Sequence, residues 1–409
     1  MSQPEIVRSN PPPKFPRDEP DFSLVLGGPL YQLYLRTRLA RPPLKLLHRR
    51  MVVIPLICWL PLWPLAAAAG HLSSGVPVPF FRDPEVHIKL LVALPILIAV
   101  EVLAHARIQN VVAQFRERNI VSQEDLPHFE KMVASAMRLR NSVVMELGLF
   151  AAVVAIGYWM WGQNVKLTVS SLSISSWYAI NDGFRMHPTA AGEYYAFVSL
   201  TIFRFILLRW YFRLLIWYRF LWEVRGLPLH FNLYHPDRAG GLGFLSESLI
   251  AFAPVFVAQT TSLAAVFYAR ILYAGTRLQD WTMEIACAVL LFVLLLILPL
   301  GFFAVQLDRA ARKARIEFGS LGSHYVDEFR DKWILGRGRA GEALLGTSDI
   351  QSLADLANSY QVVSGISLLP VSKQAFIRLV VVIVLPLLPL MLTVFPLSEI
   401  IKRVFKMVL

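Results

Sequence analysis

The chain is organised around the stretch Tyr194-Tyr-Ala-Phe-Val-Ser-Leu-Thr-Ile-Phe-Arg204-Phe-Ile-Leu-Leu-Arg209-Trp-Tyr-Phe-Arg213-Leu-Leu-Ile-Trp-Tyr-Arg219-Phe-Leu-Trp222. Apart from four arginines, nearly every residue in it is apolar or aromatic. A helix rises about 1.5 Å per residue and the hydrocarbon core of a bilayer is about 30 Å thick, so roughly 20 apolar residues cross it. The stretch is long enough to span a membrane, which places some of its arginines at membrane depth.

Six further apolar runs have the length of membrane-spanning helices. They cover residues 51–70, 87–104, 143–162, 249–272, 283–305 and 375–395. Hydrophobic residues make up 56% of the 409 residues, charged residues make up 17% and mean hydropathy is +0.52, whereas a typical soluble domain has about 25% charged residues. The sequence therefore predicts an all-α, polytopic transmembrane bundle of about seven spans. Two cysteines exclude a disulfide framework.

The distribution of positive charge predicts the orientation of the spans. Lys and Arg outnumber Asp and Glu by 40 to 28, giving a formal net charge of +12. These cations concentrate in residues 1–50 and in the connections 107–141 and 306–374, while the alternate connections carry few. Because cytoplasmic loops are enriched in Lys and Arg, residues 1–50 are predicted to be a basic cytoplasmic segment ahead of a six-span bundle at 51–306. No motif for binding nucleic acid accompanies the charge, so the expected partner is the lipid bilayer.

The last third of the chain is predicted to contain a cytoplasmic helical insertion at 307–374, followed by the last span and an amphipathic tail at 375–409. Seven spans leave the C-terminus outside, yet the tail is basic, with Lys402, Arg403 and Lys406. Two interpretations remain open: an amphipathic helix at the interface, or a re-entrant pair broken at Pro386 and Pro389. About 21 residues suit one span better than two, which favours the amphipathic tail.

Charged residues at membrane depth form the first candidate site. Its members are Arg204, Arg209 and Arg213 of the fourth span, with Glu101, Glu146 and Glu247 at the cytoplasmic ends of three other spans. An arginine at the bilayer centre costs about 2.5–3.5 kcal/mol on insertion scales, so the arginines are expected to face the bundle and pair with the acids. The cluster is interpreted either as a static salt-bridge network or as a polar cavity for an anion, a lipid headgroup or a proton.

The connection before the fifth span supplies the second candidate site. Its members are Asp237, Arg238, Gly240, Gly241, Gly243 and Glu247. A glycine-rich turn that opens a helix exposes N–H groups to which an anion can bind. The alternative is a tight loop whose glycines adopt positive φ and whose Asp237 caps a helix. His230 and His235 with these acids are a weaker candidate metal site, because their spacing matches no zinc signature.

Two stretches carry a resemblance to a known family. His235-Pro-Asp-Arg-Ala-Gly-Gly-Leu-Gly-Phe-Leu245 and Ser348-Asp-Ile-Gln-Ser-Leu-Ala-Asp-Leu356 resemble segments of an uncharacterised family of bacterial polytopic inner-membrane proteins. The resemblance covers most of the chain after the N-terminal tail. It implies a multi-pass location in the bacterial inner membrane, and it carries no activity or functional residue over to this chain.

No catalytic motif is found: Gly-x-Ser-x-Gly and His-Glu-x-x-His are both absent, and no cofactor is expected. The favoured function is transport or permeation, or binding of a small anion or an anionic lipid, at the polar cluster in the cytoplasmic half. One alternative is a scaffold that recruits a protein partner through residues 307–374. Another is a membrane-embedded enzyme that uses His230, His235 and Asp237 at the lipid interface.

Overall fold

The computed structural model describes residues 22–42, 44–162, 174–182, 186–337 and 348–394. These residues are almost entirely helical, with one two-stranded antiparallel hairpin, so the predicted all-α fold is confirmed. The α-helices are α1 Pro29–Arg36, α2 Leu47–Trp59, α3 Leu62–Ala68, α4 Pro84–Ile88, α5 Leu94–Glu117, α6 Leu126–Arg140, α7 Val143–Gly162, α8 Ala190–Tyr194, α9 Leu200–Val224, α10 Ser246–Ala274, α11 Thr282–Ile297, α12 Ala304–Phe329, α13 Ser348–Ser364 and α14 Lys373–Val384. The hairpin strands are β1 Ala179–Asn181 and β2 Met186–Pro188.

Consecutive helices join into rods long enough to cross a membrane. Within the described ranges, six helical segments have the required length and apolar character, and the pair α6–α7, bent by 43°, supplies a seventh. The longest rods are Pro84–Glu117 with 34 residues, Ala190–Val224 with 35 and Leu278–Ile334 with 57. The prediction of about seven spans is confirmed, and the chain is built as a multi-pass membrane protein.

Prolines mark the irregular turns within these rods. Proline lacks the N–H that continues the helical ladder, and tighter or wider turns absorb the loss. A π-turn at Lys89–Ala93 precedes Pro95, and a 3-10 turn at Leu298–Phe303 contains Pro299. The last span continues through Pro386 and Pro389 as one 21-residue segment, Lys373–Thr393, so the described part of the chain forms one span there and no re-entrant pair. The tail predicted to be amphipathic lies outside the described residues.

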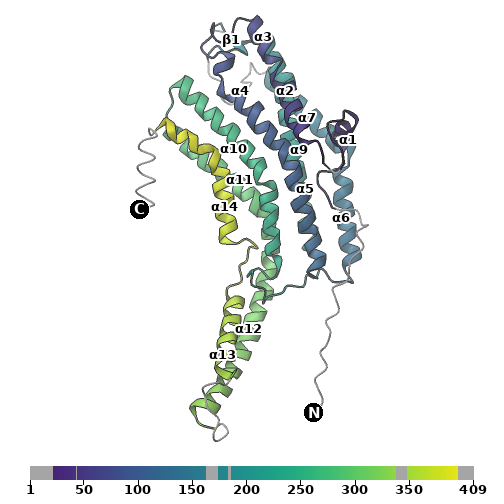
Figure 1. The fold of residues 1–409 in the computed structure, drawn as a ribbon, viewed down its shortest axis with the longest axis vertical. Helices are drawn as coiled ribbons and strands as arrows, with labels where there is room; N and C mark the ends of the chain where they lie inside the picture. Colours follow the sequence, from purple (N-terminus) through teal and green to yellow (C-terminus); the bar gives the residue numbers. More distant parts are fainter. Residues whose placement is uncertain (1–21, 43, 163–173, 183–185, 338–347, 395–409) are drawn as a thin grey trace.

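The rods give the molecule two distinct ends (Figure 1). The hairpin β1–β2, α3 and α4 lie at one end, which we call the hairpin end. At the other, α12 extends beyond the bundle and α13 packs alongside it, and we call residues 307–337 and 348–366 the arm. The base of the arm has a small core of its own: Leu307, Ala311, Ala314, Val363 and Ile366. We call the end of the molecule that carries the arm the arm end.

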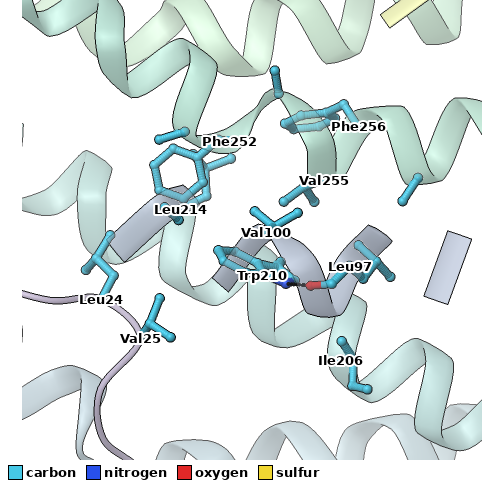
Figure 2. Packing of buried hydrophobic residues seen from close by; sticks show 14 of the residues in the cluster. Leu24, Val25, Leu97, Val100, Ile206, Trp210, Leu214, Phe252, Val255 and Phe256 are labelled. Atoms are coloured by element: carbon cyan, nitrogen blue, oxygen red, sulfur yellow. Dashed lines mark hydrogen bonds between the residues drawn. The ribbon is translucent and has the colours of Figure 1, made fainter. Parts of the chain in front are cut away.

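The centre of the bundle is the packing of α5 against α10, with α2 and α9 beside α5. Figure 2 shows side chains of α5, α9, α10 and residues 24–25 gathered around Trp210. The indole Nε1 of Trp210 donates a hydrogen bond to the Leu97 carbonyl at 2.8 Å. Outer faces remain apolar: Val144 is 79% exposed and Leu290 is 68% exposed. An apolar outer surface of this extent is what a lipid environment requires.

Residues 22–42 and 44–46, which we call the N-terminal segment, pack against the bundle. Phe22, Leu24 and Val25 are buried in the main core, and Tyr31 and Tyr34 are the buried side chains of α1. Part of the segment predicted to be a basic cytoplasmic extension therefore belongs to the packed core. Its backbone reaches the charged side chains described below.

Asp83 at the hairpin end generates a pH dependence of stability. It caps α4, accepting hydrogen bonds from Glu85 N at 2.9 Å and from Trp177 Nε1 at 2.8 Å. Burial, followed by the neighbouring Glu85 carboxylate, raises the pKa of Asp83 to about 6. Because the unfolded carboxyl titrates near pH 4, the folded chain binds the proton more tightly. The associated stability, on the order of 3 kcal/mol, is present below pH 4 and is lost as the pH rises to about 6.

We expect Asp83→Asn to remove this pH dependence while keeping an acceptor oxygen for the helix cap. Between pH 4.5 and 7, the apparent unfolding temperature of the detergent-solubilised variant should gain several degrees relative to wild type. Intrinsic tryptophan fluorescence during heating measures both proteins in the same buffers. A difference between the two proteins that does not change with pH would contradict the prediction.

Candidate functional site

Five charged side chains are buried together where α2, α5, α7 and α9 meet, and we call them the charge cluster. They are Arg50, Glu101, Glu146, Arg209 and Arg213. None is more than 7% exposed, and Arg50 is fully buried. Buried charges are stable only when they are paired and hydrogen-bonded, so the geometry of these pairs matters for the whole bundle.

Glu101 of α5 lies at the centre of the cluster. Its carboxylate is in contact with Arg50 of α2. It also accepts a hydrogen bond from Arg213 Nη2 at 3.2 Å and forms an ion pair with Arg209 Nη1 at 3.5 Å. One carboxylate thus faces three guanidinium groups from two different helices.

The N-terminal segment completes the cluster on the side of Glu146. Glu146 Oε1 pairs with Arg209 Nε at 3.0 Å and accepts a hydrogen bond from Leu30 N at 3.2 Å. Arg209 Nη2 donates to the Gly27 carbonyl at 3.3 Å. Gly28 has a φ of 85°, and a Cβ there would lie 2.6 Å from Glu146 Oε2, so glycine is needed for this close approach.

The cluster carries an excess of positive charge. Three guanidinium groups face two carboxylates, which gives a formal net charge of +1. In addition, Arg50 Nε and Nη2 are buried and have no hydrogen-bond partner among the described residues. Aromatic rings supply part of the compensation: Arg50 lies 5.4 Å from the Tyr34 ring centre, and Arg213 lies 4.5 Å from that of Trp210. The surroundings of the cluster are therefore favourable for an anion.

Two pockets flank α1 next to the cluster, and both are lined by Pro29 and Leu33. The first, of about 620 Å³, includes the polar side chains of Gln32, Arg36, Arg140 and Asn141, and we call it the polar pocket. The second, of about 500 Å³, lies between α1, α2, α7 and α9, and we call it the apolar pocket. Its lining is aliphatic and aromatic, with Glu146 and Thr37 as polar exceptions besides the Tyr34 hydroxyl.

The structure brings together four of the six residues predicted for the first site. Glu101, Glu146, Arg209 and Arg213 meet in the charge cluster. The other two lie apart.

Arg204 and Glu247 have different surroundings. Arg204 makes no ion pair with a carboxylate in the described part of the chain and is only partly buried. Glu247 pairs instead with Arg107 of α5. Helical periodicity alone places Arg204 on the face opposite Arg213, so its separation follows from the sequence, whereas the partner of Glu247 depends on how α10 packs against α5.

The glycine-rich connection of the second predicted site is closed by its own aspartate. Asp237 Oδ1 accepts hydrogen bonds from Ala239 N at 2.9 Å and Gly241 N at 3.2 Å, and Asp237 Oδ2 accepts one from Gly243 N at 2.9 Å. Gly240 and Gly241 have φ values of 63° and 87°. The N–H groups that were expected to hold an anion are thus bound to the Asp237 carboxylate, in agreement with the tight-loop alternative.

The same connection joins the bundle to the arm. His230 N donates to the Ile120 carbonyl at 2.8 Å, and the Arg238 carbonyl accepts from Ser367 N at 2.8 Å. His235 Nδ1 lies 3.1 Å from Asp237 Oδ1. No group of three or more potential metal-ligating side chains occurs in the described residues, so the metal site suggested around His230 and His235 is not assembled there.

The sequence analysis missed Arg50 and the N-terminal segment as parts of the site. Arg49 and Arg50 both precede the first apolar run, yet Arg49 is exposed and Arg50 is fully buried. The available signal was their position next to a span, which does not reveal which of two adjacent arginines faces inward. In the sequence, Gly27 and Gly28 are two adjacent glycines, and this pattern alone does not indicate that they belong to the site.

We expect Glu101→Gln to destabilise the protein strongly, because three buried guanidinium groups lose their shared counter-charge. Breaking a buried ion pair from one side costs about 3–5 kcal/mol, so the apparent unfolding temperature should fall by many degrees. Replacing both Glu101 and Arg213 by Met should restore part of the loss. The control is Arg219→Gln, which breaks an exposed pair with Glu223 and should change stability by less than about 1 kcal/mol. Equal effects of Glu101→Gln and Arg219→Gln would overturn the assignment.

Comparison with models of known protein families, with curated proteins and with solved structures gives no match. The resemblance of the stretch at 235–245 to a bacterial membrane family therefore stays a prediction. The helical architecture by itself identifies the chain as a multi-pass membrane protein.

Proposed function

We propose that this membrane protein binds an anionic lipid at α1. The headgroup would occupy the polar pocket, and an acyl chain would occupy the apolar pocket. The observation that carries the proposal is that Pro29 and Leu33 of α1 line both pockets, because a polar and an apolar cavity on either side of one short helix match the two halves of an amphiphile.

The polar pocket has the chemistry to bind a phosphate-bearing headgroup. Arg36 is exposed and makes no ion pair in the described ranges, and Arg140 borders the same pocket. Arginine binds phosphate oxygens through charge-assisted and bidentate hydrogen bonds. Gln32 and Asn141 add uncharged polar groups. The net positive charge of the nearby charge cluster favours an anion over a neutral headgroup.

The apolar pocket has the chemistry to bind an acyl chain. Ile54 and Ile57 of α2, with Phe150 of α7 and Phe205 of α9, contribute to a cavity of about 500 Å³ that opens at the apolar outer surface of the bundle. Moving a methylene group from water into an apolar environment is favourable by about 0.8 kcal/mol. Inside a membrane the gain is smaller, since lipid tails are equally apolar, so selectivity would come from the headgroup.

The positive-inside pattern of the sequence, in which the basic connection 107–141 is predicted to be cytoplasmic, supports placing the polar pocket, which Arg140 and Asn141 line, on the cytoplasmic side. With the resemblance to bacterial inner-membrane proteins, this orientation leads us to propose that the lipid belongs to the inner leaflet of a bacterial plasma membrane. Transport of the lipid or of its headgroup is an extension of this proposal that the same pockets would serve.

Lipid-dependent stabilisation tests the proposal. Phosphatidylglycerol should raise the apparent unfolding temperature of the delipidated protein by several degrees, because a ligand that binds the folded state stabilises it. Phosphatidylcholine with the same acyl chains should have little effect. Native mass spectrometry should detect bound phosphatidylglycerol at the same time.

Two variants localise the effect. Arg36→Gln should at least halve the stabilisation by phosphatidylglycerol, and Leu33→Trp, which enlarges a side chain that lines both pockets, should abolish it. Arg312→Gln is the matched control, because Arg312 is exposed on the arm and, among the residues that the structure describes, forms an ion pair with Asp308 alone. Equal stabilisation of wild type and both pocket variants would refute lipid binding at α1.

A second function, recruitment of a protein partner through the arm, is supported by the exposed apolar side chains beyond its core. Leu321 is 51% exposed, Val326 is 50% exposed and Ile334 is 71% exposed. We expect Leu321→Glu/Val326→Glu to abolish co-purification of any bound protein while the unfolding temperature changes little. The matched control is Ser320→Glu/Ser323→Glu, on the same helix, and an identical set of co-purifying proteins in all variants would contradict this function.

A further inference from the structure

A third pocket, of about 650 Å³, lies between α5 and the start of α10, and no residue of α1 lines it. One wall is a polar stripe along α5 that includes Arg107, Asn110, Gln114 and Arg118. Residues spaced three or four apart lie on one face of a helix. Gly243 and Glu247 contribute to the opposite wall.

The two arginines are held in place by neighbours within the pocket. Arg107 pairs with Glu247, which leaves its Nε buried and without a hydrogen-bond partner among the described residues. The Arg118 guanidinium lies 5.2 Å from the Phe244 ring centre, and its Nη1 donates to the Gly241 carbonyl at 3.3 Å. Fixed guanidinium groups lose little conformational freedom when a ligand binds.

The amide side chains of the stripe have free hydrogen-bonding capacity. Neither the side-chain amide of Asn110 nor that of Gln114 has a hydrogen bond to another described residue. Two arginines face one glutamate, so the pocket carries a formal net charge of +1. The backbone N–H groups of the adjoining loop are bound by Asp237, so the donors available to a ligand are the side chains of α5.

We propose that this pocket binds the phosphate group of a small organic phosphate or of a lipid headgroup, with Arg107 and Arg118 as its charged donors. Guanidinium groups match phosphate oxygens in charge and geometry, and Asn110 and Gln114 donate to the remaining oxygens. The volume exceeds that of a bare phosphate ion, so an organic substituent fits beside it. The site lies on different helices from α1 and does not depend on the proposed lipid binding there.

Binding of glycerol 3-phosphate to the full-length protein in uncharged detergent tests the site. Titration followed by 31P NMR line broadening should show saturable binding to wild type. Arg118→Gln should weaken it about tenfold, because one charge-assisted hydrogen bond is lost. Asn110→Asp should abolish it through repulsion, whereas Asn110→Ala should reduce it only modestly. Asn110 and Arg118 are both exposed, so these variants are expected to fold, and their unfolding temperatures verify this.

A second experiment distinguishes the two sources of phosphate. Nanodiscs of phosphatidylglycerol should compete with glycerol 3-phosphate if the headgroup of a lipid is the ligand, and should leave the titration unchanged if the ligand is soluble. Either outcome supports the site provided that Asn110→Asp removes binding. Absence of binding of both probes to wild type, or binding to Asn110→Asp equal to wild type, would overturn the proposal. Leu33→Trp at α1 should leave this titration unchanged, which distinguishes a failure here from a failure of the lipid site.

Discussion

The packing of the bundle depends on the Glu101 carboxylate, which faces Arg50, Arg209 and Arg213 inside a membrane protein. Without it, three guanidinium groups would be buried with Glu146 as their single described counter-charge. Low dielectric strengthens each attraction and also raises the cost of any charge left unpaired. The interaction therefore fixes the relative positions of α2, α5 and α9 more tightly than apolar contact would, because acyl chains and aliphatic side chains compete equally for apolar surfaces.

The N-terminal segment extends this constraint to a stretch of irregular backbone. Non-helical backbone at membrane depth is tolerated where its polar groups are satisfied by protein, and Gly27 and Leu30 are bound by Arg209 and Glu146. The charge cluster thus holds α1 against the helices. The same contacts create the polar and apolar pockets on either side of α1, so the electrostatic network and the proposed lipid site have one physical origin.

The Asp237 loop shows how one carboxylate organises a junction between structural units. The Asp237 carboxylate accepts hydrogen bonds from three backbone N–H groups. These bonds fix a turn that requires positive φ at Arg238, Gly240 and Gly241. That turn contacts the end of α5, the beginning of α10 and the backbone of Ser367, which follows α13. The sequence pattern predicts both the glycine turn and the capping aspartate. It leaves open whether the N–H groups bind an external anion, because an internal carboxylate satisfies the same donors.

The sequence by itself determined the number and the approximate positions of the spans, since about 20 apolar residues per crossing and the placement of prolines follow from bilayer thickness and backbone chemistry. It also determined that Arg209 and Arg213 share a face and that acids lie at comparable depth. Only the tertiary structure decided the pairing of Glu247 with Arg107 and the burial of Arg50 rather than Arg49. Helical periodicity fixes the direction of a side chain relative to its own helix, whereas its partner depends on the rotation and neighbours of that helix, which are set by packing between segments far apart in the chain.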